Sequence, residues 1–179
     1  KTELFDKKDF YDRNAFLLCS MDISGIQSFI YTISSKNALK TLRARSFYLE
    51  IMMEHIIDLL LDRLQLSRAN LFYSGGGHCY LLLANTTKTV IQIQKFQEEL
   101  KEWLLKQFQT DLFVAFGYEQ CTGNAFRNVP EGSYTELFRK MSKMLSLQKQ
   151  HRYTAREIIR LNNRKEQDSL GLQKNRICR

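Results

Sequence analysis

The chain has 179 residues, 44% of them apolar, and a formal net charge of +8. This length suits a single domain with or without an appendage, and the apolar share is enough for a hydrophobic core. No stretch reaches the roughly 18 uninterrupted apolar residues of a membrane-spanning helix, and residues 1–12 lack the apolar region of a secretory signal. We therefore expect a soluble, cytoplasmic protein with no membrane partner.

The positive charge is concentrated at one end. Residues 133–179 hold twelve Lys and Arg against four Asp and Glu, whereas the charges of residues 1–132 balance. A basic segment after a neutral core favours an acidic partner, nucleic acid first. The alternative is a solvated helix face.

The cysteines are scattered and form no Cys-x-x-Cys pair. Cys19, Cys79 and Cys121 fall in apolar runs, where a free cysteine packs as a small apolar residue. A disulfide framework is therefore not expected, which suits a reducing compartment.

Hydrophobic periodicity divides the chain into strands and helices. In chain order we predict a strand at 16–23, helices at 26–34 and 38–66, strands at 70–74 and 79–84, a helix at 87–109 and a strand at 112–121. Beyond residue 133 the chain is helical and basic. Ser133 and Thr154, each with Glu three residues later, indicate helix starts.

The order βααββαβ is that of an α+β fold with helices on one face of an antiparallel-rich sheet. It fits the ferredoxin-like group, which includes polymerase palms, cyclases and RNA-recognition modules. We predict a ferredoxin-like domain at residues 16–132 after a lead-in at 1–15. Residues 133–179 are predicted to be a basic helical extension or linker that leads to a further domain.

Two features of this topology are expected to line one pocket. Asp22 ends the first strand before Ser24-Gly25, and Gly75 to Gly77 join the second and third strands. The helix start after Gly25 would offer free N–H groups to phosphate, and glycines let a triphosphate approach the backbone. The structural alternative is that the glycines serve a tight turn and the acid caps a helix.

Three blocks of sequence carry a family resemblance, in the right order and with the right elements between them. They are Met21-Asp22-Ile23-Ser24-Gly25-Ile26-Gln27-Ser28-Phe29-Ile30, Leu42-Arg43-Ala44-Arg45-Ser46-Phe47-Tyr48-Leu49 and Tyr73-Ser74-Gly75-Gly76-Gly77-His78. Together they closely resemble the first palm domain of the large subunit of type III-A (Csm) CRISPR effector complexes, over nearly the whole chain. The resemblance implies a polymerase/cyclase palm with a nucleotide site at Asp22, Ile23, Ser24, Gly25, Ser74, Gly75, Gly76, Gly77 and His78.

The family is distantly related to diguanylate cyclases, in which a strand-ending Asp and the acids of a Gly-Gly-Asp-Glu hairpin hold two Mg²⁺ ions. Asp22 and Gly75-Gly76 match that pattern, but Gly77 and His78 stand where the acids would be. Glycine supplies no ligand, and histidine is a poor ligand for magnesium. No metal site and no catalytic residue are expected in this segment alone, which argues against an ordinary diguanylate cyclase.

In the family, a second palm with Gly-Gly-Asp-Asp makes cyclic oligoadenylates from ATP, and an HD domain cuts single-stranded DNA. Neither motif occurs in this sequence. The resemblance therefore implies one part of a larger nucleotidyltransferase, contributing half of a composite ATP site for antiviral signalling. Mg²⁺ or Mn²⁺ would enter only through the partner palm. The implied partners are that second palm, other subunits of the complex, guide RNA and target RNA.

Several residues outside the hairpin are weaker candidates. Arg43, Arg45 and Ser46 are expected at the edge of the nucleotide pocket or in surface ion pairs. The family carries a zinc-binding insertion after this palm, and Cys178 stands where its first cysteine is expected, although one cysteine does not establish zinc. Contacts with RNA or neighbouring subunits are predicted for Arg152, Arg156 and Arg160.

The competing hypothesis is an RNA-recognition or scaffold module of a ribonucleoprotein, without nucleotide chemistry. The sheet of an RNA-recognition module carries Lys/Arg-Gly-Phe/Tyr and outward aromatic side chains on its third strand. Residues 78–83 lack that pattern.

Overall fold

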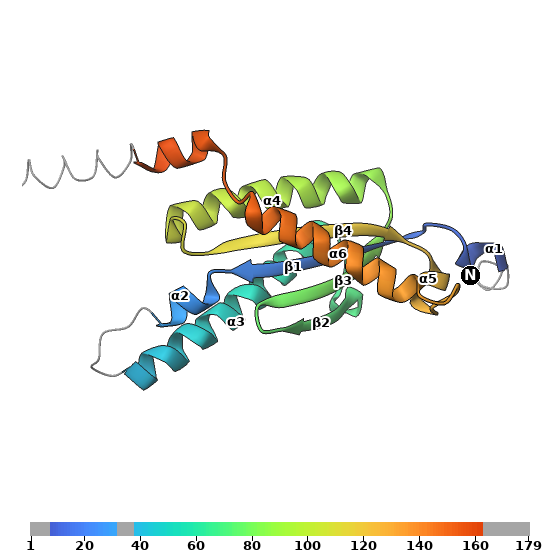
Figure 1. Cartoon of the computed structure of the whole chain (residues 1–179), viewed down its shortest axis with the longest axis horizontal. Coiled ribbons are helices and arrows are strands. Elements are labelled where there is room, and N and C mark those ends of the chain that lie inside the picture. Colours follow the sequence, from blue (N-terminus) through green and yellow to red (C-terminus); the bar gives the residue numbers. More distant parts are fainter. Residues whose placement is uncertain (1–7, 32–37, 163–179) are drawn as a thin grey trace, which may run out of the picture.

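A computed structural model describes residues 8–31 and 38–162 of the chain. Four strands form one antiparallel sheet in the order β2-β3-β1-β4. Their bounds are β1 (Phe16–Ser24), β2 (Leu71–Gly75), β3 (His78–Ala84) and β4 (Phe113–Cys121). The predicted ferredoxin-like α+β fold is confirmed, with the first strand in the centre (Figure 1).

Helices connect and flank these strands. Their bounds are α1 (Lys8–Tyr11), α2 (Ile26–Tyr31), α3 (Ala38–Arg63), the 3-10 helix η2 (Arg68–Asn70), α4 (Thr87–Phe108), α5 (Gly123–Phe126) and α6 (Ser133–Gln150). A further helix covers residues 155–162. Within the described parts of the chain, none of these helices has both the length and the apolarity needed to cross a bilayer.

The main hydrophobic core lies between the sheet and the pair α3 and α4. Successive side chains of a strand point to opposite faces, so alternate residues of β1 enter this core: Leu17, Cys19, Met21 and Ile23. Apolar residues of α3 at helical spacing, including Met53, Ile57 and Leu60, complete it and are almost fully buried. The long helix predicted from the sequence therefore forms one wall of the core.

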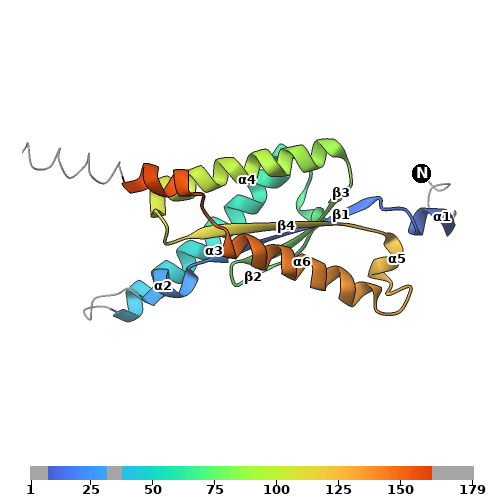
Figure 2. The same cartoon turned by 45° about the horizontal axis from the view of Figure 1, so that its top comes forward.

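The expectation that helices cover only one face of the sheet is wrong. Helix α6 lies on the face opposite α4 (Figure 2). Its buried residues Leu137, Met141 and Leu145 form a second core with the outward side chains of the sheet, which are Leu18, Phe113, Ala115 and Cys121. The sequence predicted that residues 133–179 form an extension of the domain. Residues 133–150 instead share a core with it. Apolar residues recur at helical spacing along α6, and Phe138 also packs against this core, so the sequence did carry a signal for this packing.

Both predicted helix starts are confirmed, but only the one at Thr154 has the expected capping box. The backbone N–H of Thr154 donates to Glu157 Oε2 over 2.7 Å, and the N–H of Glu157 donates back to Thr154 Oγ1 over 3.3 Å. At α6, in contrast, the N-cap is Gly132 in the left-handed region with φ 88°. There the Asn128 side chain accepts hydrogen bonds from the N–H groups of Gly132 and Tyr134. An upstream side chain therefore fills the role expected of Ser133.

The packing of α6 generates a stability prediction with a matched control. We expect Leu145→Ala to lower the free energy of unfolding by about 2–5 kcal/mol, because Leu145 is 4% exposed in the second core. Leu147→Ala, two residues further along the same helix and 48% exposed, should cost within about 0.5 kcal/mol. Urea unfolding measures both. Equal small effects would mean that α6 is an appendage after all.

Candidate functional site

Asp22 lies near the end of the central strand, on the face of the sheet that α6 covers. In the register of β1 it stands opposite His78 of β3 and Ala115 of β4. Its carboxylate meets two nitrogen groups: Lys149 Nζ donates to Oδ2 over 2.6 Å, and His78 Nδ1 lies 3.4 Å from the same oxygen. We call Asp22, His78 and Lys149 the Asp22 cluster.

The electrostatics of the cluster keep Asp22 ionised. Partial burial by itself raises the pKa of Asp22, but hydrogen bonds from His78 and Lys149, with the Lys149 charge, lower that pKa below its usual value. The carboxylate is therefore already neutralised by an internal ammonium group. Among the described residues, no three His, Cys, Asp or Glu side chains come together in a way that could hold a metal ion.

His78 is oriented from its other side by Ser20. The Ser20 hydroxyl donates to the carbonyl of Cys79 over 2.9 Å and lies 3.1 Å from His78 Nε2. Because this hydroxyl has a single proton, it accepts from the ring nitrogen when it donates to the carbonyl. The ring is thus fixed between Ser20 and Asp22.

The glycine hairpin adjoins the Asp22 cluster, as the topology predicted. The N–H of Ile23 donates to the carbonyl of Gly77 over 2.8 Å, which attaches the tip of the hairpin to the end of β1. At the tip, Gly76 has φ 61°, and a Cβ added there would have nothing within 4 Å. The backbone of Gly76 therefore faces open space, next to the Gly77 carbonyl that bonds to Ile23.

Other predicted residues have structural partners. Gly25 has φ 93°, and an added Cβ would lie 1.8 Å from the carbonyl oxygen of Asp111, so backbone packing alone requires glycine there. Ile23 and Ser24 are buried. The Ser74 hydroxyl donates to Glu54 of α3, on the face of the sheet away from Asp22. The side chains of these residues therefore do not join the Asp22 cluster, although the residues lie next to it or to the hairpin in the sequence.

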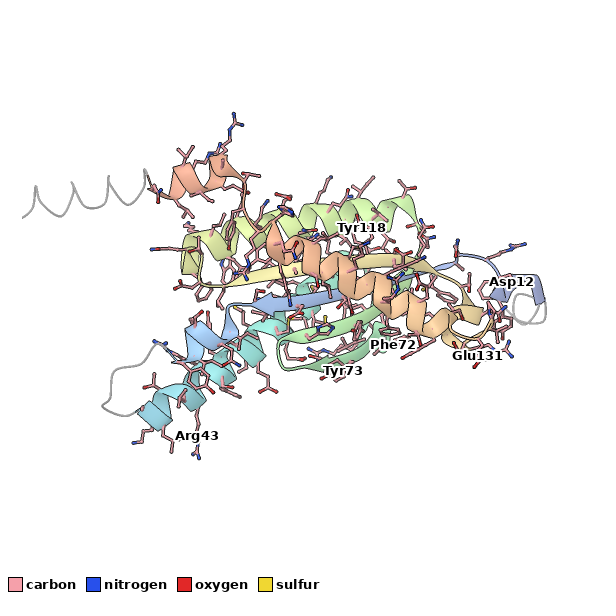
Figure 3. All side chains as sticks on the ribbon, in the orientation of Figure 1. Asp12, Arg43, Phe72, Tyr73, Tyr118 and Glu131 are labelled. Atoms are coloured by element: carbon pink, nitrogen blue, oxygen red, sulfur yellow. The ribbon has the colours of Figure 1, made fainter. Side chains whose placement is uncertain are left out.

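The candidates on α3 sit apart from the cluster. A guanidinium N–H of Arg45 donates to the carbonyl of Phe29, and its charge lies 5.4 Å from the centre of the Phe29 ring, so Arg45 joins α3 to α2. Arg43 and Ser46 are exposed, and Arg43 projects outward from the helix (Figure 3). Their role at a pocket edge stays a prediction.

Of the basic candidates after α6, one has a structural partner and two are exposed. Arg152 donates from Nε to the carbonyl of Lys149 and so stabilises the backbone that carries that lysine. Arg156 and Arg160 are exposed on the following helix. Cys178 lies outside the described residues.

Lys149 is the site residue that sequence reasoning missed. It comes from the last turn of α6, 127 residues from Asp22, within a segment whose basic residues were treated as one group. The spacing of Lys149 four residues after the buried Leu145 is the signal that was available, because it places the lysine on the side of the helix facing the sheet.

Comparison with known proteins decides the family. The sequence model of the family described as Csm1 subunit domain B matches residues 15–164. The chain belongs to this family. A Cas10/Csm1 single-strand-specific deoxyribonuclease of subtype III-A from Enterococcus italicus is 51% identical over 156 residues, which cover 87% of this chain and 20% of the relative. The corresponding protein of Mycobacterium tuberculosis is 47% identical over 189 residues, covering 99% and 23%.

Solved structures of Csm1 share the fold. A Csm1-Csm4 cassette without ligand superposes with a TM-score of 0.72 at 35% identity, covering 80% of this chain and 20% of that one. The cassette in complex with AMPPNP gives 0.71 at 36% identity, covering 78% and 19%. The resemblance to the large subunit of type III-A complexes is thus confirmed, and this Csm1 domain B chain spans about a fifth of the length of its curated relatives.

The Asp22 cluster generates a pH prediction. Because the folded pKa of Asp22 is depressed, the ionised carboxylate contributes stability above its unfolded pKa of about 3.9 and loses it as the pH falls through the folded value. Lys149→Met should therefore destabilise the chain at pH 7, and the difference from wild type should shrink below about pH 4.

Urea unfolding of the variant and wild type from pH 7 to pH 3 measures this difference. Lys143→Met, which removes an exposed lysine of the same helix, is the control and should show no such pH dependence. A loss of stability from Lys149→Met that is constant across the range would contradict the ion pair.

Proposed function

We propose that this chain is the first palm domain of the large subunit of a type III-A CRISPR effector, and that it forms half of a composite ATP site for cyclic oligoadenylate synthesis. The observation that carries the proposal is the Asp22 cluster, in which a lysine ammonium stands beside an open glycine hairpin. The related Csm1-Csm4 cassettes have been solved with AMPPNP, ATP, pppApA and cA4. Nucleotide binding by these relatives supports nucleotide binding here.

The residues of this palm suit phosphate binding better than metal binding. Lys149 offers an ammonium group on a flexible stem, one third exposed, and Gly76 exposes backbone without a side chain in front of it. Asp22 holds the ammonium over the end of the central strand. A two-metal site does not fit, because Gly77 supplies no ligand and the Asp22 carboxylate is engaged by Lys149 and His78. Metal ions would come with a partner palm, and we assign this chain no catalytic residue.

The proposal also defines partners. A composite site needs the second palm of the same subunit, and the exposed Arg156 and Arg160 suit contacts with guide RNA, target RNA or a neighbouring subunit. The deoxyribonuclease activity in the names of the relatives would belong to another domain. Such an effector would work in the cytoplasm.

The competing RNA-recognition module is disfavoured, because α6 covers the face of the sheet that carries Leu18 of the central strand. An RNA-recognition module presents that face to RNA.

The glycine hairpin tests the proposal most directly. We expect Gly76→Val in the complete subunit to leave assembly and RNA binding intact but to remove most cyclic oligoadenylate synthesis. The added side chain would stand in the open space in front of the hairpin, without a clash inside the fold. The measurement is ATP turnover per assembled complex, with a melting curve alongside.

Gly132→Val is a matched control for this substitution. Gly132 also has a positive φ, of 88°, and its added Cβ also has nothing within 4 Å, but it lies at the start of α6. Both variants should carry a similar backbone strain of about 1–3 kcal/mol. Equal turnover in the two variants would rule out a nucleotide at the hairpin.

The basic surface has its own test. We expect charge reversal at Arg156 and Arg160 to weaken RNA binding or assembly. The slope of log affinity against log salt should become shallower by roughly one unit for each phosphate that the arginines no longer neutralise. The same reversal at Lys88 and Lys95, which are exposed on α4, is the control. An unchanged salt slope would identify the two arginines as part of a solvated face.

A further inference from the structure

Aromatic side chains extend from the Asp22 cluster across the neighbouring strands. We call Tyr73, His78, Tyr80, Tyr134 and Phe138 the aromatic strip. Tyr80 is its centre, with ring centroids 4.6 Å from His78, 5.2 Å from Phe138 and 6.4 Å from Tyr73. Tyr134 follows, 4.6 Å from Phe138. The strip begins at a residue that contacts Asp22 and ends at the outer edge of the sheet.

The register of the hairpin sets the strip on one face. Tyr73 of β2 pairs with Tyr80 of β3, and Gly75 pairs with His78. Paired residues share a face, and so do residues two apart, so these four positions face the same side as Asp22, opposite His78 on β1. An irregularity in β2 between Leu71 and Tyr73 changes the strand alternation just before this point. Figure 3 shows Phe72 and Tyr73 projecting from β2 beside α6.

Tyr73 is the member that combines exposure with contact to the hairpin. It is 53% exposed. A Cβ added at Gly75 would lie 2.9 Å from the Tyr73 hydroxyl and 3.3 Å from the ring carbon that bears it. The phenol therefore leans over the glycine backbone toward the tip. A side chain at Gly75 would therefore displace this ring from its present position.

The strip and the Asp22 cluster lie within reach of one nucleotide. Tyr73 and Asp22 are separated by two strand spacings and, because Tyr73 is level with Ser20, by two residues along the strand, or about 12 Å in all. A ribose and triphosphate can bridge that span with the phosphates toward Lys149. A base at the far end would meet an exposed aromatic ring, and rings bind the π-face of any base.

We propose that Tyr73, flanked on the neighbouring strand by Tyr80, is the surface on which an adenine base stacks in this palm. The inference rests on the proposed function. A base suits the site better than a protein partner, because the strip continues into charged groups at Asp22 and Lys149. The tyrosine hydroxyls also add hydrogen-bonding capacity that a purely apolar docking surface lacks. The adenine comes either from ATP or from an oligoadenylate intermediate.

The test is equilibrium binding to the complete, assembled subunit, with AMPPNP, pppApA and inorganic tripolyphosphate as separate probes. We expect Tyr73→Ala to weaken the binding of AMPPNP, of pppApA or of both by about 5- to 100-fold at the nucleotide site of this palm. Tyr73→Phe, which keeps the ring, should stay close to wild type. Tripolyphosphate, which has no base, should bind wild type, Tyr73→Ala and Tyr73→Phe equally. Phe47→Ala, which removes an exposed ring from α3, is the matched control and should change nothing.

The three probes distinguish ATP from an oligoadenylate as the source of the base. They also distinguish a failure of the stacking proposal from a failure of the proposed function. A defect confined to AMPPNP assigns the surface to ATP, and a defect confined to pppApA assigns it to the growing product. Equal weakening of tripolyphosphate would overturn stacking, because Tyr73 would then only shape the hairpin. Normal nucleotide binding with impaired assembly or RNA binding would overturn it in favour of a macromolecular contact. If Tyr73→Ala has no effect while Gly76→Val and Lys149→Met weaken AMPPNP, this inference fails alone. If all three variants bind normally, the proposed function fails with it.

Discussion

Lys149 and Asp22 are 127 residues apart, yet an ion pair of 2.6 Å joins them, and the arrangement of the candidate site depends on it. It connects the last turn of α6 to the central strand at the point where the glycine hairpin joins that strand. Helix α6 can place the lysine there because Leu137, Met141 and Leu145 fix its axis over the sheet. The hydrophobic second core therefore provides the position, and the ion pair provides the charge at the site.

An ammonium group next to a strand-ending carboxylate changes the chemistry of a cyclase-like fold. In a metal-dependent cyclase such a carboxylate coordinates a divalent ion, which then attracts the phosphates. Here the positive charge comes from the chain, at 2.6 Å from the carboxylate, and the His78 ring occupies a further position beside it. This arrangement agrees with our proposal that the palm binds a triphosphate through Lys149 and leaves metal chemistry to a partner.

Successive side chains of β2 and β3 point to opposite faces of the sheet, so the hairpin has one side that packs on α3 and another that carries the candidate functional residues. Toward α3, Ser74 bonds to Glu54, which also pairs with Arg68 at 2.6 Å, and Arg68 binds Asp58 through two N–H groups at 2.8 Å each. Toward α6 lie Gly75, His78, Tyr73 and Tyr80. One side anchors the hairpin to the long helix, so the other can stay open without loss of rigidity.

The sequence determined the elements, their order and the meeting of Asp22 with the glycine hairpin, because hydrophobic periodicity and strand pairing are set by local spacing and by a small number of allowed topologies. It also indicated the family, through three blocks of residues that are short and contiguous. Only the tertiary structure decided that α6 belongs to the fold, that Asn128 rather than Ser133 caps it, and that Lys149 reaches Asp22. These contacts join residues that are far apart in the chain or separated by a loop. The position of Lys149 four residues after Leu145 points to the sheet only once α6 is known to pack there through Leu145. The strain and crowding at Gly25 likewise depend on the carbonyl of Asp111, far along the chain, so the structural need for that glycine was visible only once the chain had folded.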